Sequence, residues 1–254
     1  MGLGATPAQP AGLAPGDIAS ILDWWKLAGV DTIVSDEPTA WFSAPEASES
    51  YDAPLQPAPA VQPAPPRPVE QGWWTAITTL PDLAAQMAAR HPRAPFADGN
   101  PQSGLMILGE APSADDLKTG RPFTGPAGQF LDRMLAAIGL DRTSCYIALL
   151  CPRRPIPGPP TPEDIVQDIA LTRAHIRLAA PRHLLLLGAN PVQALAGETA
   201  PITRVRGSWL SVDAGAAAPV PALATFNPAY LLRRPEEKAR AWADLLALKH
   251  RISQ

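Results

Sequence analysis

The sequence is poor in cysteine: only Cys145 and Cys151 occur among 254 residues. Both fall in or beside the apolar run 145–150, which predicts a strand. Six positions along a strand separate two residues by roughly 20 Å, too far for a disulfide. We therefore expect two buried free thiols, as is usual for proteins of the reducing cytoplasm.

Long apolar runs are also missing. No segment approaches the roughly 20 consecutive apolar residues that a membrane-spanning helix needs. Residues 1–4 carry neither the basic part nor the apolar part of a secretory signal. The sequence thus predicts a cytoplasmic protein with no membrane contact.

Several common chemistries lack their residues. No glycine-rich loop is followed by the lysine of a phosphate-binding site, no histidines and cysteines have zinc spacing, and no serine stands between glycines as in a nucleophile elbow. None of the four histidines falls at the carboxyl end of a predicted strand, so we expect them on the surface or in helix packing. These absences exclude the commonest nucleotide, zinc and serine-hydrolase sites.

Charge divides the chain into unequal parts. Residues 1–70 carry nine acidic and two basic side chains, whereas residues 71–254 carry fifteen acidic and nineteen basic ones. We predict an acidic arm over 1–44, a linker over 45–70 with eight prolines between 45 and 68, and one domain over 71–254. Residues 17–28 have apolar spacing typical of a short helix, which either docks on the domain or binds a protein partner.

Four continuously apolar runs alternate with helical patterns along the domain. This order favours an α/β fold with three layers, α/β/α, around a central four-stranded parallel sheet, and we expect a monomer. The predicted strands are 105–108, 145–150, 184–187 and 222–226, with a further edge strand within 204–212. The predicted helices are 80–90, 125–138, 161–179, 191–196 and 235–251.

Two polar loops follow the first and last of these strands, at 109–125 and 227–233. Because parallel strands end at one edge of the sheet, we expect the loops to meet there and form a site. An aromatic ring at Phe123, an amide at Asn227 and the carboxylates that follow strand 105–108 suit a nucleobase pocket. Alternatively, Phe123 is a core residue, and Asp115 and Asp116 belong to a solvated turn or a helix cap.

The loop sequence GEAPSADDLKTGRPFTGPAGQFLDRML at 109–135 resembles the first motif of the family 4 uracil-DNA glycosylases, the iron–sulfur type. Further similarities follow in the same order at 146–148, 154–155, 206–209 and 227–233, so that the resemblance covers about residues 96–250. It implies a DNA partner, a flipped base, and hydrolysis of the N-glycosidic bond of uracil or another deaminated base in base-excision repair.

The resemblance also implies roles for particular residues. Catalysis falls on Glu110, Asp116 and Asn227. Base binding falls on Phe123, Ala111, Pro112 and Leu149. Contact with DNA falls on Arg154, Arg206, Tyr230, Leu231, Leu232 and Arg233, of which 230–233 form the loop that fills the space left by the flipped base.

The sequence departs from the family at functional positions. Leu149 replaces an asparagine that reads the uracil edge, and Asn227 replaces a catalytic histidine. The four cluster cysteines are absent, with two of their positions falling on Arg153 and Asp168, so we predict no iron–sulfur cluster and no other metal. Two hypotheses follow: an active glycosylase with altered chemistry, or a catalytically degenerate relative that binds DNA or a repair partner.

Overall fold

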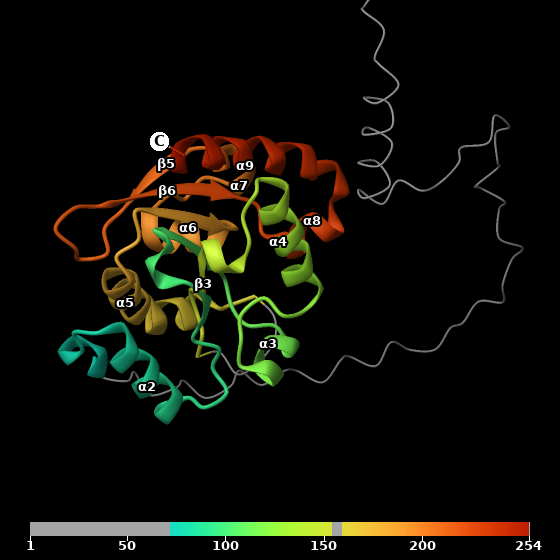
Figure 1. The fold of residues 1–254 in the computed structure, drawn as a ribbon. Coiled ribbons are helices and arrows are strands. Elements are labelled where there is room, and N and C mark those ends of the chain that lie inside the picture. Colours follow the sequence, from blue (N-terminus) through green and yellow to red (C-terminus); the bar gives the residue numbers. More distant parts are fainter. Residues whose placement is uncertain (1–71, 154–158, 254) are drawn as a thin grey trace, which may run out of the picture. The chain divides into compact units, whose positions relative to one another are not determined.

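A twisted sheet of six strands, in the order β1-β3-β2-β4-β6-β5, forms the centre of the protein (Figure 1). The computed structural model describes residues 72–153 and 159–253. The four inner strands are parallel and the two edge strands are antiparallel. Their bounds are β1 Ala97–Gly99, β2 Leu105–Gly109, β3 Tyr146–Leu149, β4 His183–Leu187, β5 Trp209–Val212 and β6 Val220–Thr225.

Helices cover both faces of the sheet, which confirms the predicted three-layer α/β class (Figure 1). The α-helices are α2 Leu80–Arg90, α3 Ala114–Thr119, α4 Pro126–Ala137, α5 Pro162–Ala179, α6 Ala189–Ala196, α7 Ile202–Val205, α8 Pro228–Arg233 and α9 Lys238–Ile252. The short 3₁₀ turns are η1 Trp73–Ala76, η2 Pro101–Ser103, η3 Arg142–Ser144 and η4 Pro235–Glu237.

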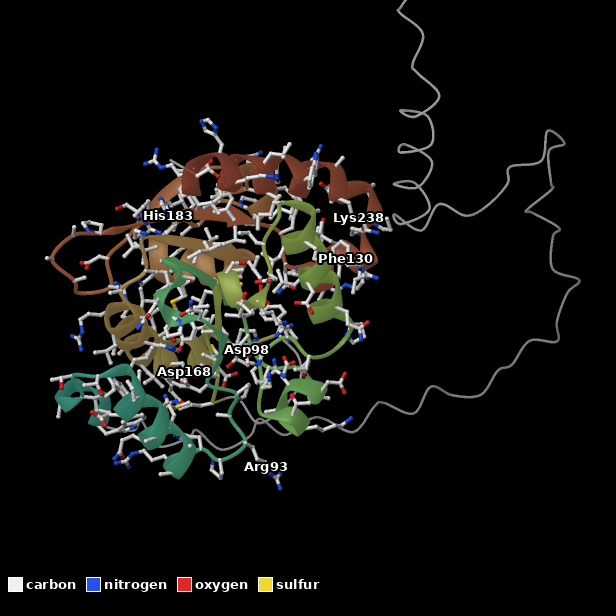
Figure 2. The ribbon with its side chains drawn as sticks, viewed as in Figure 1. Arg93, Asp98, Phe130, Asp168, His183 and Lys238 are labelled. Atoms are coloured by element: carbon white, nitrogen blue, oxygen red, sulfur yellow. The ribbon has the colours of Figure 1, made fainter. Side chains whose placement is uncertain are left out.

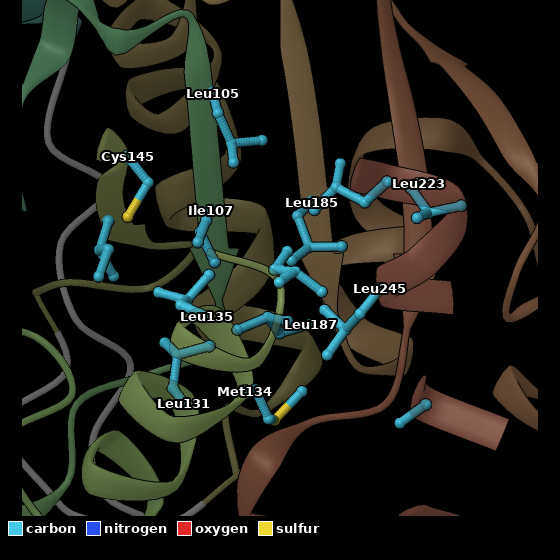
Figure 3. Packing of buried hydrophobic residues seen from close by; sticks show 14 of the residues in the cluster. Leu105, Ile107, Leu131, Met134, Leu135, Cys145, Leu185, Leu187, Leu223 and Leu245 are labelled. Carbon is cyan, nitrogen blue, oxygen red and sulfur yellow. The ribbon is translucent and has the colours of Figure 1, made fainter. Parts of the chain in front are cut away.

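Alternation along the strands builds two hydrophobic cores. In β2, Ile107 packs on the side of α4 and α9, with Leu135 and Leu245 (Figure 3). Its neighbour Leu108 points to the opposite core, with Ile176 of α5 and residues of α6. Successive side chains of a strand face opposite ways, so a strand buried on both faces must be apolar at every position. This is why the inner strands are readable in the sequence as unbroken apolar runs.

Helix caps explain where the predicted helices begin. Thr161 accepts a hydrogen bond from the backbone of Asp164, whose side chain bonds back to Thr161, so α5 starts with a capping box. Proline is the first residue of α4 and α5 and the second of α2, where the missing N–H costs nothing. The predicted helices over 80–90, 125–138 and 161–179 are confirmed to within about a residue.

Some predicted elements need correction. Residues 96–101 have turn composition, yet Ala97–Gly99 pairs with β3 as an edge strand. The edge strand predicted within 204–212 is shorter, because Ile202–Val205 forms α7 before β5 begins. Helices α3 and α8, which were not among the predicted helices, lie within the two polar loops, and Asp116 belongs to the cap of α3, one of the alternatives considered for it.

A third cluster attaches the start of the domain. Trp74 of η1 and Leu83 and Met87 of α2 pack on Leu171 of α5.

Among the described residues no helix is long and apolar enough to cross a membrane. The acidic arm, the helix predicted at 17–28, the proline-rich linker and Arg154 lie outside the described residues. The predicted domain bounds therefore stay a prediction.

Candidate active site

The two loops meet at the carboxyl edge of the parallel strands, as expected, and enclose a cavity of about 460 Å³. Residues that directly follow β2, β4 and β6 line it, namely Glu110, Gly188 and Phe226. Eight of the predicted site residues line it: Glu110, Ala111, Pro112, Asp116, Phe123, Asn227, Tyr230 and Arg233. A volume in the range of small-molecule pockets, at a strand edge of an α/β sheet, fits a ligand-binding site.

Glu110 is the partly buried acidic group of this cavity. Burial raises the pKa of its carboxyl above the usual 4.5. Three neighbours act against that rise: hydrogen bonding from the backbone of Asn190, hydrogen bonding from the side chain of Asn227, and the positive charge of Arg233. The carboxylate therefore sits in a desolvated place with its charge held by specific donors, as is typical of functional sites.

Asn227 connects Glu110 to the second loop. It is the N-cap of α8, and its Oδ1 accepts a hydrogen bond of 2.9 Å from the backbone N–H of Ala229. Since Oδ1 is used in this way, the amide nitrogen is the group available to Glu110. Asn227, where the resemblance implies a histidine, thus has its amide oxygen bonded to the backbone and its amide nitrogen bonded to the Glu110 carboxylate.

Asp116 is buried, with 3% of its surface exposed, and both of its oxygens accept hydrogen bonds. Oδ2 accepts from the backbone N–H of Ser113 at 2.9 Å, completing the capping box of α3. Oδ1 accepts from the backbone N–H and hydroxyl of Thr124, at 2.7 and 3.0 Å. The Asp116 carboxylate therefore links the start of α3 to Thr124, the residue after Phe123, by hydrogen bonds.

Phe123 is held in a left-handed backbone conformation, with a φ of 56°. This conformation is uncommon for a residue with a bulky side chain and requires support. Arg142 donates to the carbonyl oxygens of Phe123 and Pro122, and its guanidinium also pairs with Asp98 and Asp132. Asp98, labelled in Figure 2, lies on the edge strand β1. Arg142 is far from the loop in sequence and was not predicted as a site residue.

Leu149 packs near the Phe123 ring and is not among the residues that line the cavity. A Cβ built on Gly109 would stand 2.5 Å from the Phe123 ring and 3.1 Å from Cδ2 of Leu149, so the three residues pack closely. Leu149 is 2% exposed at the end of β3 and contributes to the core. The structure accordingly puts an apolar group near the ring, where the resemblance implies a base-reading amide.

Comparison with known proteins identifies the family. The model of the uracil DNA glycosylase superfamily matches residues 96–246. The chain belongs to this superfamily. The type-4 uracil-DNA glycosylase of Thermotoga maritima is 34% identical over 148 residues, 56% of this chain and 73% of its own. That of Archaeoglobus fulgidus is 33% identical over 152 residues, covering 58% and 75%, and that of Pyrobaculum aerophilum is 32% identical over 154 residues, covering 58% and 78%.

The residues that the glycosylase resemblance assigns to DNA contact lie in different environments. Tyr230 and Arg233 line the cavity, and Leu232 is 40% exposed beside them. Leu231 is 1% exposed and packs in the core, on the opposite side of α8. DNA contact by this loop stays a prediction, and the structure narrows the surface that can make it to Tyr230, Leu232 and Arg233.

Arg206 is not among the residues that line the cavity. Its guanidinium pairs with the buried carboxylate of Asp244 and donates to the carbonyl oxygen of Arg240. Asp244 also accepts a hydrogen bond of 2.7 Å from the hydroxyl of Thr225, at the end of β6. These contacts give Arg206 a structural role between β6 and α9, and they do not support the predicted contact with DNA.

The residues of this superfamily member do not fit an iron–sulfur cluster. Such a cluster is held by four cysteine thiolates, and the sequence has two cysteines. Both are buried and neither forms a disulfide, as predicted. Burial raises the pKa of Cys145 to about 12, which disfavours the thiolate that binds metal. Within the described part of the chain, no group of three or more histidine, cysteine, aspartate or glutamate side chains could hold a metal ion.

Arg153 and Asp168, at two positions where cluster cysteines are expected, form a buried ion pair instead. Arg153 Nη2 lies 2.5 Å from Asp168 Oδ1, with the two side chains 8% and 6% exposed. Arg153 also donates to the carbonyl oxygen of Gln167 and lies over the ring of Trp74. The pair therefore joins the segment after β3, helix α5 and the start of the domain.

Proposed function

We propose that the protein is a DNA glycosylase of base-excision repair, which releases uracil or another deaminated base from DNA. The observation that supports this most is the position of Glu110 and Phe123 on the wall of one cavity, in a chain of the uracil DNA glycosylase superfamily. A base turned out of the duplex needs a stacking surface and a shielded polar group, and these two residues supply them.

In the proposed reaction, the bond between C1′ of the deoxyribose and the base nitrogen breaks, and its electron pair leaves with the base. The oxygen of a water molecule bonds to C1′ on the opposite face of the sugar. The ionised carboxylate of Glu110 stabilises the positive charge that develops on the sugar and accepts the proton of the attacking water, which then passes to the departing base. Phe123 stacks on the base, and Ala111 and Pro112 line the space beside it.

Asp116 and Asn227 are proposed to act beside Glu110 in catalysis. Asp116 holds the loop that presents Phe123. Asn227 carries no charge, so any stabilisation of a leaving base by this residue is through its amide dipole. Because Glu110 takes a hydrogen bond from Asn227, the asparagine acts on the carboxylate as well.

Base selectivity is expected to differ from that of a site with an edge-reading asparagine. A site that hydrogen-bonds its substrate discriminates strongly against analogues, whereas an apolar wall does not. Leu149 packs near Phe123 and is not among the residues that line the cavity, so position 149 contributes no amide to it. We therefore propose that uracil is accepted together with other deaminated bases.

The remaining proposals concern partners and cofactors. DNA is the proposed substrate, read by Tyr230, Leu232 and Arg233 together with Arg154. We propose that the protein works as a cytoplasmic monomer without an iron–sulfur cluster, and that residues 17–28 contact a protein partner. Anaerobically purified protein is expected to contain no iron, and a visible absorbance band of iron and sulfide would contradict the proposal about the cluster.

An abasic-site cleavage assay tests the proposed function. Single-stranded and mismatched duplex DNA carrying uracil, hypoxanthine or xanthine is incubated with the protein and then cleaved at abasic sites. Strand breaks that require wild-type protein, and that disappear with Phe123→Ala, support it. Intact DNA with all three bases, together with salt-sensitive DNA binding, would instead favour a catalytically degenerate relative.

A further inference from the structure

Gly188 closes β4 and lies directly against Glu110. Its φ of +104° and ψ of 177° belong to a region that residues with a side chain rarely adopt. A Cβ at this position would stand 2.4 Å from Oε1 of Glu110 and 3.3 Å from Cβ of Asn227. Any residue with a Cβ at position 188 would therefore collide with the Glu110 carboxylate where it now lies.

The backbone around Gly188 has little freedom to shift. Its N–H donates a hydrogen bond of 2.9 Å to the carbonyl oxygen of Thr225, which fixes it between β4 and β6. Gly188 is also the N-cap of α6. If a side chain were added here, Glu110 would have to move, because its carboxyl end is the flexible partner of the two.

The first turn of α6 provides the donor that Glu110 would lose. Asn190 lies in that turn, where backbone N–H groups have no partner within the helix, and its backbone stabilises the Glu110 carboxylate. The positive end of the helix dipole favours a negative charge at the same point. Residues after three strands thus meet at one carboxylate. Glu110 follows β2, Gly188 and the first turn of α6 follow β4, and Asn227 follows β6.

We propose that Gly188 is a positioning residue, which seats the Glu110 carboxylate against the first turn of α6 and so fixes its direction into the cavity. The consequence for catalysis rests on the proposed glycosylase function. A carboxylate displaced from this seat no longer meets the sugar and its attacking water in one geometry, so the chemical step slows while substrate binding is kept.

The test compares Gly188→Ala with Gly197→Ala. Gly197 ends the same helix with a φ of +70°, and a Cβ there would meet nothing within 4 Å. Both substitutions put an alanine at a positive φ, but only the first collides with Glu110. The backbone strain differs between the two sites, because the ψ of 177° places Gly188 in a region open almost only to glycine, whereas Gly197 lies in the left-handed helical region. Each is made in the wild-type background and in Glu110→Ala, where the collision is removed.

Denaturant unfolding gives the readout that is independent of activity. We expect Gly188→Ala to lower the free energy of unfolding more in the wild type than in Glu110→Ala, and Gly197→Ala to lower it equally in the two backgrounds. The ¹³C resonance of the Glu110 carboxyl should also change its titration midpoint in Gly188→Ala and not in Gly197→Ala. An effect of Gly188→Ala on unfolding that is the same in both backgrounds, or an unchanged Glu110 titration, would overturn the proposal.

Base release gives the second readout. In single-turnover assays Gly188→Ala is expected to lower the rate constant by about tenfold or more with the concentration for half-saturation changed less than about twofold. Gly197→Ala should retain the wild-type rate constant. If wild-type protein releases no base, the proposed function fails, whereas unfolding and titration still decide whether Gly188 seats Glu110.

Discussion

Arg142 donates a hydrogen bond from Nη2 to the carbonyl oxygen of Phe123, across 19 residues of sequence. The same guanidinium contacts Asp98 of β1 and Asp132 of α4, so the conformation of Phe123 depends on the edge of the sheet and on a helix. The ring that lines the cavity is therefore positioned through its own backbone, by a side chain outside the cavity.

Replacement of Arg142 is expected to release this loop. Arg142→Gln removes a charge shared by two carboxylates and should lower the free energy of unfolding by about 3 kcal/mol. Arg133→Gln, on the exposed side of α4, should change it by about 0.5 kcal/mol or less. Denaturant unfolding measures both. Similar small losses in the two variants would show that Arg142 does not support the Phe123 conformation.

Asp116 offers a second test of loop support. Asp116→Asn puts an NH₂ group where one carboxylate oxygen now accepts from Ser113 or Thr124, and should cost about 1–3 kcal/mol of stability. Asp115→Asn, next to it in the same helix, loses only an exposed pair with Lys118 and should cost about 0–1 kcal/mol. Thermal or denaturant unfolding distinguishes the two variants. An equal loss of stability in both would argue against a role of Asp116 in linking α3 to Thr124.

The pH dependence of stability follows from Glu110. Burial raises the pKa of this carboxyl above 4.5, so the folded state binds its proton more tightly than the unfolded state. Its contribution to stability is complete below the unfolded pKa and is lost as pH rises through the folded pKa. Glu110→Gln should thus match wild type in acid and exceed it at neutral pH. Thermal midpoints across this range test it; a difference that stays constant with pH would contradict it.

The buried pair Arg153–Asp168 predicts an asymmetry between single and double variants. Asp168→Leu leaves Arg153 without its carboxylate and is expected to cost about 3–5 kcal/mol. Arg153→Met combined with Asp168→Leu replaces both charges by apolar groups and should be closer to wild type. Free energies of unfolding decide between the outcomes, and a double variant as unstable as the single one would show that the pair is worth more than an apolar contact.

The inner sheet and most helices are readable in the sequence because their signals are local. Unbroken apolar runs mark β2, β3, β4 and β6, and a capping threonine followed by proline marks α5. Strand β1 has no such run, since its three residues pair with β3 at an edge and include an aspartate and a glycine. Its strand conformation depends on its neighbour.

The site is predictable only in part for the same reason. Glu110, Phe123 and Asn227 lie in polar loops after apolar strands, so their meeting at one edge follows from the parallel order. Arg142 and Gly188 act through contacts that only the folded chain creates, and neither stands in a motif. For Leu231 and Arg206 the motif predicts contact with DNA, and nothing in the sequence indicates that Leu231 is buried in the core or that Arg206 pairs with Asp244.

Single-turnover release of base tests most directly whether the cavity around Glu110 is catalytic. Wild-type protein, Glu110→Gln and Glu163→Gln, an exposed glutamate of α5, are compared on DNA carrying uracil, hypoxanthine or xanthine. The predicted result is release of at least one base by wild type and Glu163→Gln, with a rate lower by about 10²–10⁴ in Glu110→Gln. Equal rates in all three proteins, or no release of any base by wild type, would contradict the proposed catalytic role of Glu110.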